Sequence, residues 1–412
     1  MKPQIDHGPW LTNPDIGRIT IGFSSAKPCA AAVEYRTGSE PWQKIHQSEG
    51  GQIVRAEKRH IFHLSGLIPG AEYEFHAAVY DPDTGEESSE TGTFTVFDPG
   101  RKDFSFLVLA DLQFSPEKRL ELLKKYHALS AADQCDFVVL LGDMLWAIDD
   151  FERDALGGII DLLKQTGYLT KPLLLMRGNH ELRGKAAWEW TRWFGSPEDR
   201  PYTMFRQGDA AFLMLDSWSD QPCSDPDFRM NLDREFLAAE KVFVRHAVEQ
   251  ESFRSAGYRI VMAHGASHSH IDQFRFLNPN MHALTDEFFM GAEPAVPIHA
   301  WLCGHIHHYI RTVPGKAECA SISRPPQPLS TPENYTFPVL TTDGPDVARE
   351  LVPPSGIQTS AFLARVTENE LDIQALSEER GGLIDRIAIL PDRRIVEKMV
   401  LPHYAWQSEK GN

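Results

Sequence analysis

The chain has 412 residues, which is enough for two or three domains of ordinary size. Its 58 Asp and Glu residues outnumber its 41 Lys and Arg residues, and the formal net charge is −17. This charge argues against nonspecific nucleic-acid binding, which needs basic side chains to neutralise phosphates. A hydrophobic content of 42% and a charged content of 24% exclude a wholly disordered chain. An anionic ligand would therefore need a local source of positive charge, such as a metal ion.

Targeting signals and disulfides are not evident in the sequence. No apolar stretch reaches the roughly 18 residues that a membrane span needs, and residues 1–8 lack the apolar core of a signal peptide. The five cysteines are an odd number without a Cys-x-x-Cys pair, which argues against a disulfide framework and against a thiolate zinc site. We therefore expect a cytoplasmic protein with no membrane partner, although export stays open.

Residues 1–99 have the pattern of an all-β domain. Polar and apolar residues alternate in short runs separated by turn residues, which is typical of a β-sandwich. The stretch Leu-Ser-Gly-Leu-Ile-Pro-Gly-Ala-Glu-Tyr, which ends at Tyr73, resembles the corner of fibronectin type III domains, where a tyrosine ties the loop to the strand. We expect a fibronectin type III-like sandwich here, followed by a linker at residues 97–102.

From residue 100 to residue 412 the pattern changes to alternating strands and helices. Helical spacing of apolar residues is found at 117–129 and 234–250, and strand patterns return after residue 360. Residues 312–354 contain nine of the 28 prolines, so we expect a long irregular loop there. Apolar runs and helices in alternation predict an α/β domain whose sheet is buried on both faces. The runs are at 104–110, 137–141, 172–176, 211–215, 258–263 and 298–303.

Five of these runs end in residues that can bind metal ions. Ligands in α/β proteins gather at the carboxyl ends of strands, so we expect these residues to converge in one crevice. Each pair or triplet is a weak signal alone, but all five in this order argue strongly for a site. The candidates are Asp111 and Gln113, Asp143, Asn179 and His180, His264, and His305 and His307.

The chemistry of the candidate ligands favours two metal ions. Carboxylate, amide and imidazole groups without a thiolate suit manganese, iron, zinc or magnesium. Seven ligands, which are these candidates without His180, are too many for one small cation that keeps an open position. They suit two divalent ions that share a bridging carboxylate, the arrangement that clamps the attacking and leaving oxygens in phosphoryl transfer.

The five blocks resemble those of the calcineurin-like metallophosphoesterase superfamily. The resemblance implies a four-layer α/β/β/α sandwich and hydrolysis of phosphate esters by a hydroxide that bridges two metals. It also implies that His180 contacts the phosphate and aids departure of the leaving group. Asp143 would bridge the metals, and Asn179 would also touch the substrate. The implied ligands are Asp111, Gln113, Asp143 and His307 for the first metal, and Asp143, Asn179, His264 and His305 for the second.

The β-sandwich and the segment 304–311 look more specifically like purple acid phosphatases and their relatives. Two residues depart from that pattern. Trp146 stands where those enzymes have an iron-binding tyrosine, and Gln113 adds an amide ligand to the same metal. We therefore expect a colourless enzyme that uses divalent metals, unless another tyrosine such as Tyr309 replaces the missing ligand.

Several alternatives stay open. The substrate is expected to be a small phosphate ester or a nucleotide-like molecule, and the enzyme a monoesterase, a phosphodiesterase or a nucleotide pyrophosphatase. A noncatalytic binding protein on a dead phosphoesterase fold is the second class. His268, His270 and Asp272 resemble the start of a metallo-β-lactamase metal motif. Because the rest of that motif is missing, His268 is expected either to line the substrate pocket or to be solvated.

Overall fold

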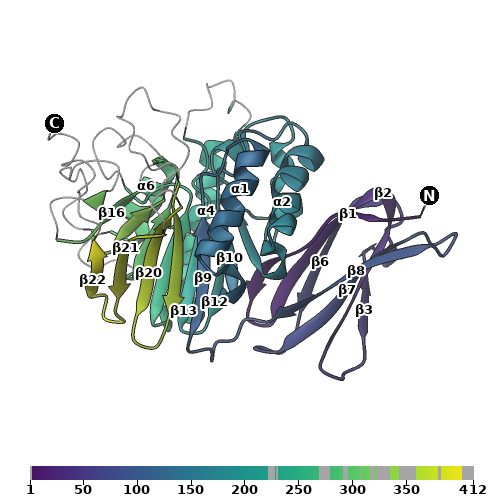
Figure 1. The fold of residues 1–412 in the computed structure, drawn as a ribbon, viewed down its shortest axis with the longest axis horizontal. Helices are drawn as coiled ribbons and strands as arrows, with labels where there is room; N and C mark the ends of the chain where they lie inside the picture. The colour runs from purple at the N-terminus through teal and green to yellow at the C-terminus, as the bar shows by residue number, and fades with distance from the viewer. Residues whose placement is uncertain are drawn as a thin grey trace.

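The computed structural model describes residues 2–220, 228, 231–268, 279–290, 296–307, 309–315, 320–321, 335–342, 359–378 and 382–400. These residues form an N-terminal β-sandwich followed by an α/β body, and Figure 1 shows the sandwich in purple beside that body. The fold class expected from the sequence is confirmed.

The sandwich is organised around one long strand, β2 (Arg18–Thr37). Its residues 18–24 pair with β1 and β6, whereas its residues 30–37 pair with β7, so the strand passes from one sheet to the other. The hydroxyl group of Tyr73 accepts a hydrogen bond from the backbone nitrogen of Ile68 at 3.1 Å, which confirms the expected tyrosine corner. The other strands are β1 (Ile5–Asp15), β3 (Gln43–His46), β4 (Ser48–Glu49), β5 (Gln52–Ile53), β6 (Glu57–Ser65), β7 (Glu72–Tyr80) and β8 (Glu87–Thr95).

Two sheets form the centre of the α/β body. In the first sheet, three parallel strands, β9 (Phe104–Leu109), β10 (Phe137–Leu141) and β11 (Leu173–Met176), continue into an antiparallel meander of β19 (Ala361–Val366), β20 (Leu371–Ser377), β21 (Gly382–Ile389) and β22 (Ile395–Val400). The second sheet has the order β12 (Thr203–Gln207), β13 (Ala210–Leu215), β14 (Tyr258–Ala263), β15 (Ala300–Cys303), β18 (Val339–Thr341), β16 (Ile310–Thr312) and β17 (Ala320–Ser321).

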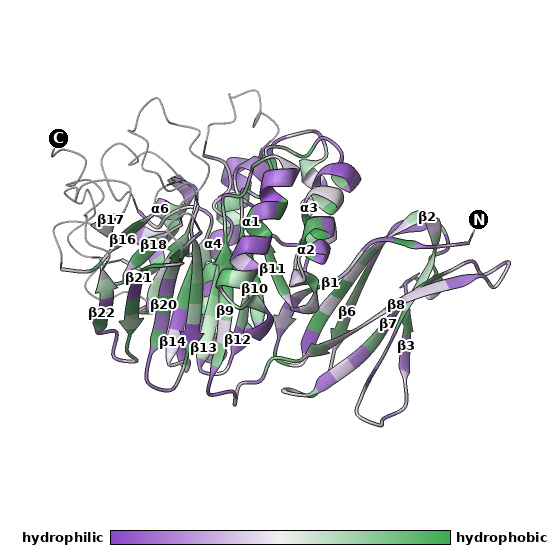
Figure 2. Ribbon diagram, viewed as in Figure 1, coloured by the Kyte–Doolittle hydropathy of each residue, from purple (hydrophilic) through white to green (hydrophobic). Residues whose placement is uncertain are grey.

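The sheets face each other across an aromatic core, and helices cover their outer faces. Phe106 stacks on Phe137 within the first sheet at 5.0 Å and meets Phe212 of the second sheet edge-on at 5.3 Å. In Figure 2 hydrophobic residues are concentrated in the strands, whereas the outward face of α1 is hydrophilic. One side is covered by α1 (Pro116–Leu129), the π-helix η2 (Glu152–Ile160), α2 (Asp161–Gln165) and α3 (Trp190–Phe194), and the other by α4 (Asp233–Glu249), α5 (Glu251–Arg254) and α6 (Pro279–Phe288).

The two helices predicted at 117–129 and 234–250 correspond to α1 and α4, whereas η2, α2, α3, α5 and α6 were not predicted. Helix α1 begins after Ser115, whose hydroxyl group accepts a hydrogen bond from the backbone nitrogen of Lys118, and proline occupies its first turn. Four short 3₁₀ turns connect the longer elements. They are η1 (Ala132–Gln134), η3 (Tyr168–Thr170), η4 (His180–Leu182) and η5 (Ala187–Glu189).

Strand β1 joins the sandwich to the body. It lies between β11 and β2, and Thr12 pairs with Leu173 in a parallel arrangement. Trp10 is fully buried and packs against Trp193 and Phe194, with ring centroids 6.2 and 5.6 Å away. The two parts therefore share a continuous sheet, while a domain boundary near residue 99 stays a prediction.

The region predicted as one long irregular loop, residues 312–354, contains regular structure. Strand β18 is buried and pairs with β15 and β16, so the prediction is wrong for these residues. The remaining proline-rich positions lie largely outside the described residues. None of the described helices combines the length and apolarity required to cross a membrane.

Candidate metal centre

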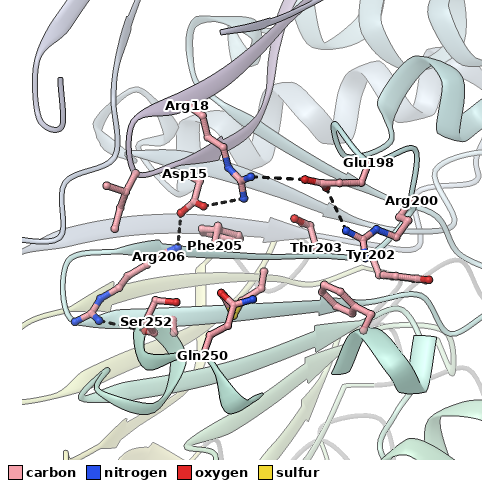
Figure 3. A pocket seen from close by; sticks show the side chains of 14 residues that line it. Asp15, Arg18, Glu198, Arg200, Tyr202, Thr203, Phe205, Arg206, Gln250 and Ser252 are labelled. Carbon is pink, nitrogen blue, oxygen red and sulfur yellow. Dashed lines mark hydrogen bonds and ion pairs between the residues drawn. The ribbon is translucent and has the colours of Figure 1, made fainter. Parts of the chain in front are cut away.

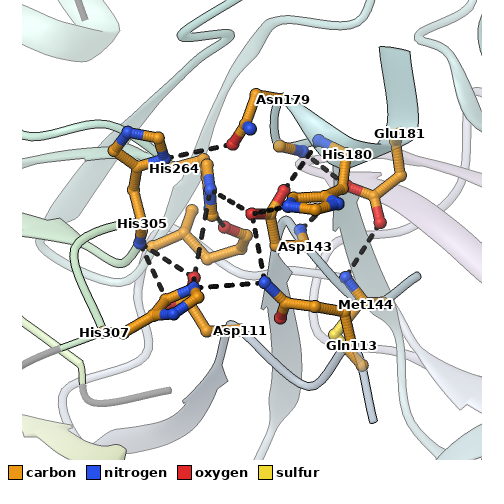
Figure 4. A network of polar contacts seen from close by, with 12 residues as sticks. Asp111, Gln113, Asp143, Met144, Asn179, His180, Glu181, His264, His305 and His307 are labelled. Carbon is orange, nitrogen blue, oxygen red and sulfur yellow. Dashed lines mark hydrogen bonds and ion pairs between the residues drawn. The ribbon is translucent and has the colours of Figure 1, made fainter. Parts of the chain in front are cut away.

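The predicted site residues come together at the carboxyl ends of neighbouring strands, as Figure 4 shows. Asp111 follows β9, Asp143 follows β10, and His264 follows β14. Parallel pairing of these strands with their neighbours brings their ends to one edge of each sheet. The same edge receives Gln113 after β9, Asn179 and His180 after β11, and His305 and His307 after β15.

The glycines of the motifs allow the loops to approach each other. A Cβ atom on Gly178 would lie 2.1 Å from Oδ1 of Asp143, and one on Gly304 would lie 2.2 Å from Oδ2 of Asp111. Any larger residue would therefore displace a carboxylate. Four candidate ligands adopt a left-handed φ, which is a strained conformation for residues other than glycine. Such strain is often retained at functional sites. They are Asp111 at 55°, Asp143 at 53°, His305 at 76° and His307 at 52°.

Two groups of potential ligands share one carboxylate. Ligand atoms of Asp143, His264 and His305 lie within 4.8 Å of one another, and so do ligand atoms of Asp111, Asp143 and His307. Oδ2 of Asp143 is 3.1 Å from Nε2 of His264, and Oδ1 of Asp111 is 3.5 Å from Nε2 of His307. Asp143 is the member common to both groups.

The tautomer of His264 suits a ligand role. Its Nδ1 donates to the backbone oxygen of Leu141 at 2.9 Å, which directs Nε2 into the cluster. Burial by itself would lower the pKa of His264, but the carboxylates of Asp143 and Asp111 raise it to about 10. A cation bound to Nε2 has to displace that proton.

The other charges of the cluster favour a cation as well. Burial opposes ionisation of Asp143, yet the adjacent imidazoles, chiefly that of His264, hold its pKa well below the usual range. Burial and His264 lower the pKa of His305 to about 4, so its imidazole is neutral. An ionised carboxylate and a neutral imidazole are the forms that bind metals.

Amide groups and unsatisfied atoms provide an independent test of whether the residues fit a metal. The side-chain oxygen of Asn179 points into the cluster, where it lies 3.0 Å from Nδ1 of His305, 3.2 Å from Oδ2 of Asp143 and 3.3 Å from Nε2 of His264. A cation between these atoms would stabilise this orientation. Nε2 of His305 and Oε1 of Gln113 are buried without a hydrogen-bond partner among the described residues. The residues therefore fit a metal centre.

Gln113 differs from the expected geometry in its amide orientation. Its nitrogen, not its oxygen, faces His307 Nε2 at 3.1 Å and Asp143 Oδ2 at 3.4 Å. The amide oxygen can reach this position only after a half-turn of the amide. Gln113 thus lies where the sequence placed it, and its role as a ligand stays a prediction.

His180 lies at the edge of the cluster, and one of its ring nitrogens is available for proton transfer. Nδ1 donates to the backbone oxygen of Trp146 at 3.0 Å, and Nε2 is 3.8 Å from Oδ2 of Asp143. Burial lowers the pKa of His180. The indole of Trp146 packs edge-on against the imidazole at 4.9 Å and is 46% exposed as a residue.

Glu181 has a structural role that the sequence did not reveal. Its buried carboxylate accepts hydrogen bonds from four backbone nitrogens, which joins the turn after β10 to the turn after β11. Glu181 belongs to the Gly-Asn-His-Glu motif, but the motif alone does not predict which backbone amides its side chain binds. The donors are Asp143 at 2.8 Å, Met144 at 2.8 Å, Leu145 at 3.0 Å and Gly178 at 2.7 Å.

Three further residues have positions that the sequence left open or missed. Thr342, after β18, donates to Oδ2 of Asp111 at 3.2 Å and was not predicted. His268 is 5% exposed and packs on Tyr335, so it is not a solvated histidine, while His270 and Asp272 lie outside the described residues. Tyr309 donates to Asp385 at 2.6 Å in the core, so its hydroxyl is directed away from the cluster.

A separate hollow of about 260 Å³ contains none of the cluster residues. Figure 3 shows it between the turn that joins β1 to β2 and the edge strand β12. Arg18 pairs with Asp15 at 2.8 Å, and Arg200 pairs with Glu198 at 3.4 Å. Its charged groups are therefore largely paired with each other.

Comparisons with known proteins agree with this geometry. The family model described as calcineurin-like phosphoesterase matches residues 104–309, half of the chain. A purple acid phosphatase from yellow lupin (Lupinus luteus) seeds has a TM-score of 0.65 at 14% identity, covering 94% of this chain and 74% of the lupin chain. A structure of PhoD has a TM-score of 0.59 at 10% identity, covering 95% and 91%. These two likenesses concern the fold alone. No curated protein sequence matched the chain.

Proposed function

The chain belongs to the calcineurin-like phosphoesterase family, whose members are metal-dependent phosphoester hydrolases, and we propose that it hydrolyses small phosphate esters with two divalent ions. The observation that carries the two-ion proposal is the pair of ligand groups that meet at Asp143. One carboxylate with two oxygens can serve both ions, and its negative charge offsets part of theirs.

The proposed ligands are those expected from the motifs. Their oxygen and nitrogen atoms suit manganese, iron, zinc or magnesium. Such ions would polarise the phosphoryl group and supply a water-derived nucleophile near neutral pH. The first ion would be held by Asp111, Gln113, Asp143 and His307, and the second by Asp143, Asn179, His264 and His305.

The proposed task of His180 is to assist the leaving group. Its Nδ1 is held by the backbone oxygen of Trp146, so only Nε2 can exchange a proton with the substrate. We infer that Nε2 carries a proton to the leaving-group oxygen. The negative charge of a bound phosphoryl group would favour the protonated imidazole, against the effect of burial.

A neighbouring cavity suggests what the rest of the substrate is like. A cavity of about 750 Å³ is lined in part by Arg177, which directly precedes Gly178 of the metal-binding turn. Trp218 stacks on Phe236 at 3.9 Å in its wall, and Trp188 and Leu232 are 62% and 65% exposed. Flat or apolar leaving groups, including nucleobases, suit these walls. This supports the alternative of a nucleotide-directed phosphodiesterase or pyrophosphatase beside a monoesterase.

The test combines metal analysis with a substrate panel. We expect Asp143→Ala and His305→Ala to lose both bound metal and hydrolysis, because each removes a group from the shared cluster. Asp83→Ala, in an exposed loop of the sandwich, removes the same charge elsewhere and should retain both. The panel contains an aryl phosphate, an aryl diester and a nucleotide pyrophosphate. A folded wild-type protein that binds metal yet hydrolyses none of them would support the noncatalytic alternative instead.

A further inference from the structure

Arg183 is a positively charged residue beside the candidate metal ligands, and the proposed function gives it no role. Its backbone nitrogen donates to the oxygen of His180 at 3.1 Å, and its own oxygen accepts from the nitrogen of Ile148 at 2.8 Å. Its guanidinium carbon lies 5.1 Å from the ring centre of Phe228, which is buried. The residue is therefore fixed in the same turn as His180, with its side chain held against an aromatic ring.

The charge of Arg183 has no protein counterion in the part of the chain that the structure describes. No ion pair joins its guanidinium to a carboxylate there, and its Nε is buried without a hydrogen-bond partner. Arg177, six residues earlier, differs in that its guanidinium pairs with the buried carboxylate of Asp216. An unpaired guanidinium next to predicted metal ligands is well placed to bind an anion that arrives from outside.

The orientation of the Asn179 amide indicates where an anion would bind. When its oxygen faces the cluster, its NH₂ group faces Nη2 of Arg183 at 3.2 Å, so that two donors meet. When the amide is turned round, its oxygen accepts from Arg183, but Asn179 then offers no oxygen to a metal. A metal-bound Asn179 and Arg183 thus present two adjacent donors that share no acceptor.

We propose that the NH₂ group of Asn179 and the guanidinium of Arg183 together bind a nonbridging phosphoryl oxygen of the substrate. This inference rests on the proposed function and adds a catalytic residue to it. A phosphoryl oxygen satisfies both donors at once, and guanidinium groups match phosphate oxygens in charge and geometry. The contact would strengthen as negative charge grows on the phosphoryl oxygens during the reaction.

The test measures phosphate binding separately from hydrolysis. Arg183→Gln and Arg183→Lys are compared with Arg254→Gln, which removes an exposed arginine next to β14 at the opposite end of the sheet. Metal content, the affinity of the metal-loaded protein for inorganic phosphate by calorimetry, and kcat/KM for a small aryl phosphate are measured. We expect Arg183→Gln to keep its metals, to bind phosphate at least tenfold more weakly and to lose about 10²-fold in kcat/KM. Arg183→Lys should recover part of both, and Arg254→Gln should match the wild type.

The outcomes separate this inference from the proposed function. Wild-type phosphate affinity in Arg183→Gln would overturn the inference, even if the wild-type protein hydrolyses phosphate esters. Loss of metal from Arg183→Gln would also overturn it, because Arg183 would then only position Asn179. If phosphate binding depends on Arg183 but the wild-type protein hydrolyses nothing, the phosphate contact stands and the proposed function fails.

Discussion

Glu181 connects the two turns that carry the candidate ligands Asp143 and Asn179. Burial and the charge of Asp143 raise its pKa to about 7, whereas four amide donors favour its ionised form. Glu181→Gln keeps the size but turns one acceptor into a donor that faces backbone N–H groups. Leaving buried donors unsatisfied costs about 1–3 kcal/mol each. We expect a lower melting temperature without metal and a metal affinity reduced by at least tenfold.

Calorimetry and metal titration check this prediction. Glu49→Gln is the matched control, because Glu49 is exposed in the sandwich. Unchanged melting temperature and metal affinity in Glu181→Gln would show that the amides find other acceptors and that the carboxylate is dispensable.

His180 should affect the chemical step more than metal binding. We expect His180→Ala to retain its metals and to lose about 10²–10⁴-fold in kcat, the usual contribution of a positioned acid or base. The reason is that Nδ1 is occupied by Trp146 and Nε2 is 3.8 Å from the nearest carboxylate oxygen of Asp143. Metal content and kcat of the purified variant decide the matter. Loss of metal would instead make His180 a ligand.

Trp146 leads to a prediction about colour. Its indole can donate a hydrogen bond but cannot bind iron as a tyrosinate does, and the Tyr309 hydroxyl is bonded to Asp385. We expect iron-loaded protein to lack a strong visible band of the tyrosinate–iron type. A visible spectrum of the loaded protein is sufficient, and such a band would mean that another tyrosine reaches the metal.

Strand β6 carries a histidine that should make stability depend on pH. His60 is fully buried between the hydroxyl of Ser25 and the amide of Gln47, and burial lowers its pKa from 6.5 to about 4. Between these two values the unfolded chain binds a proton that the folded chain does not. Stability therefore falls as pH falls, by about 3 kcal/mol over the whole window.

His60→Gln should flatten this dependence without abolishing it, because burial also lowers the pKa of His299 in the α/β body to about 4. Denaturant unfolding at pH 7 and pH 4.5 measures the difference between wild type and variant. An equally steep loss of stability in both proteins would show that His60 does not contribute.

Because strand β1 pairs with the sheet of the α/β body, removal of the sandwich should lower the stability of the remaining chain. Deleting residues 1–99 exposes the edge of β11 and the surface of Trp193 and Phe194 that Trp10 covers. We expect residues 100–412 to melt at a lower temperature and to aggregate more readily. The folded, metal-loaded fraction should still hydrolyse a small aryl phosphate, because no cluster residue lies in the deleted part.

Trp10→Ala in the full chain separates packing from strand pairing. It should lower the free energy of unfolding by about 3–5 kcal/mol, the cost of a large cavity, and so lower the melting temperature. The value of kcat should stay unchanged. A folded, metal-loaded 100–412 protein without any activity would show that the sandwich takes part in the reaction.

The buried strands of the α/β body, its two longest helices and the set of candidate ligands could be predicted from the sequence, whereas β18 and the shorter helices could not. Apolar periodicity indicates which faces of an element are buried. Asp143 and His264 follow apolar runs within two residues, so they fall at the carboxyl ends of strands. These relations depend only on near neighbours in the chain. Tertiary structure alone decided that Glu181 binds the turn after β10, that Thr342 supports Asp111, and that β1 extends the sheet of the body. It also brings Nη2 of Arg183 to 3.2 Å from the side-chain amide of Asn179. Such contacts depend on how segments that are distant in the sequence pack together. The orientation of a side chain where two loops meet is determined by residues of the other loop, which a local sequence pattern does not reveal.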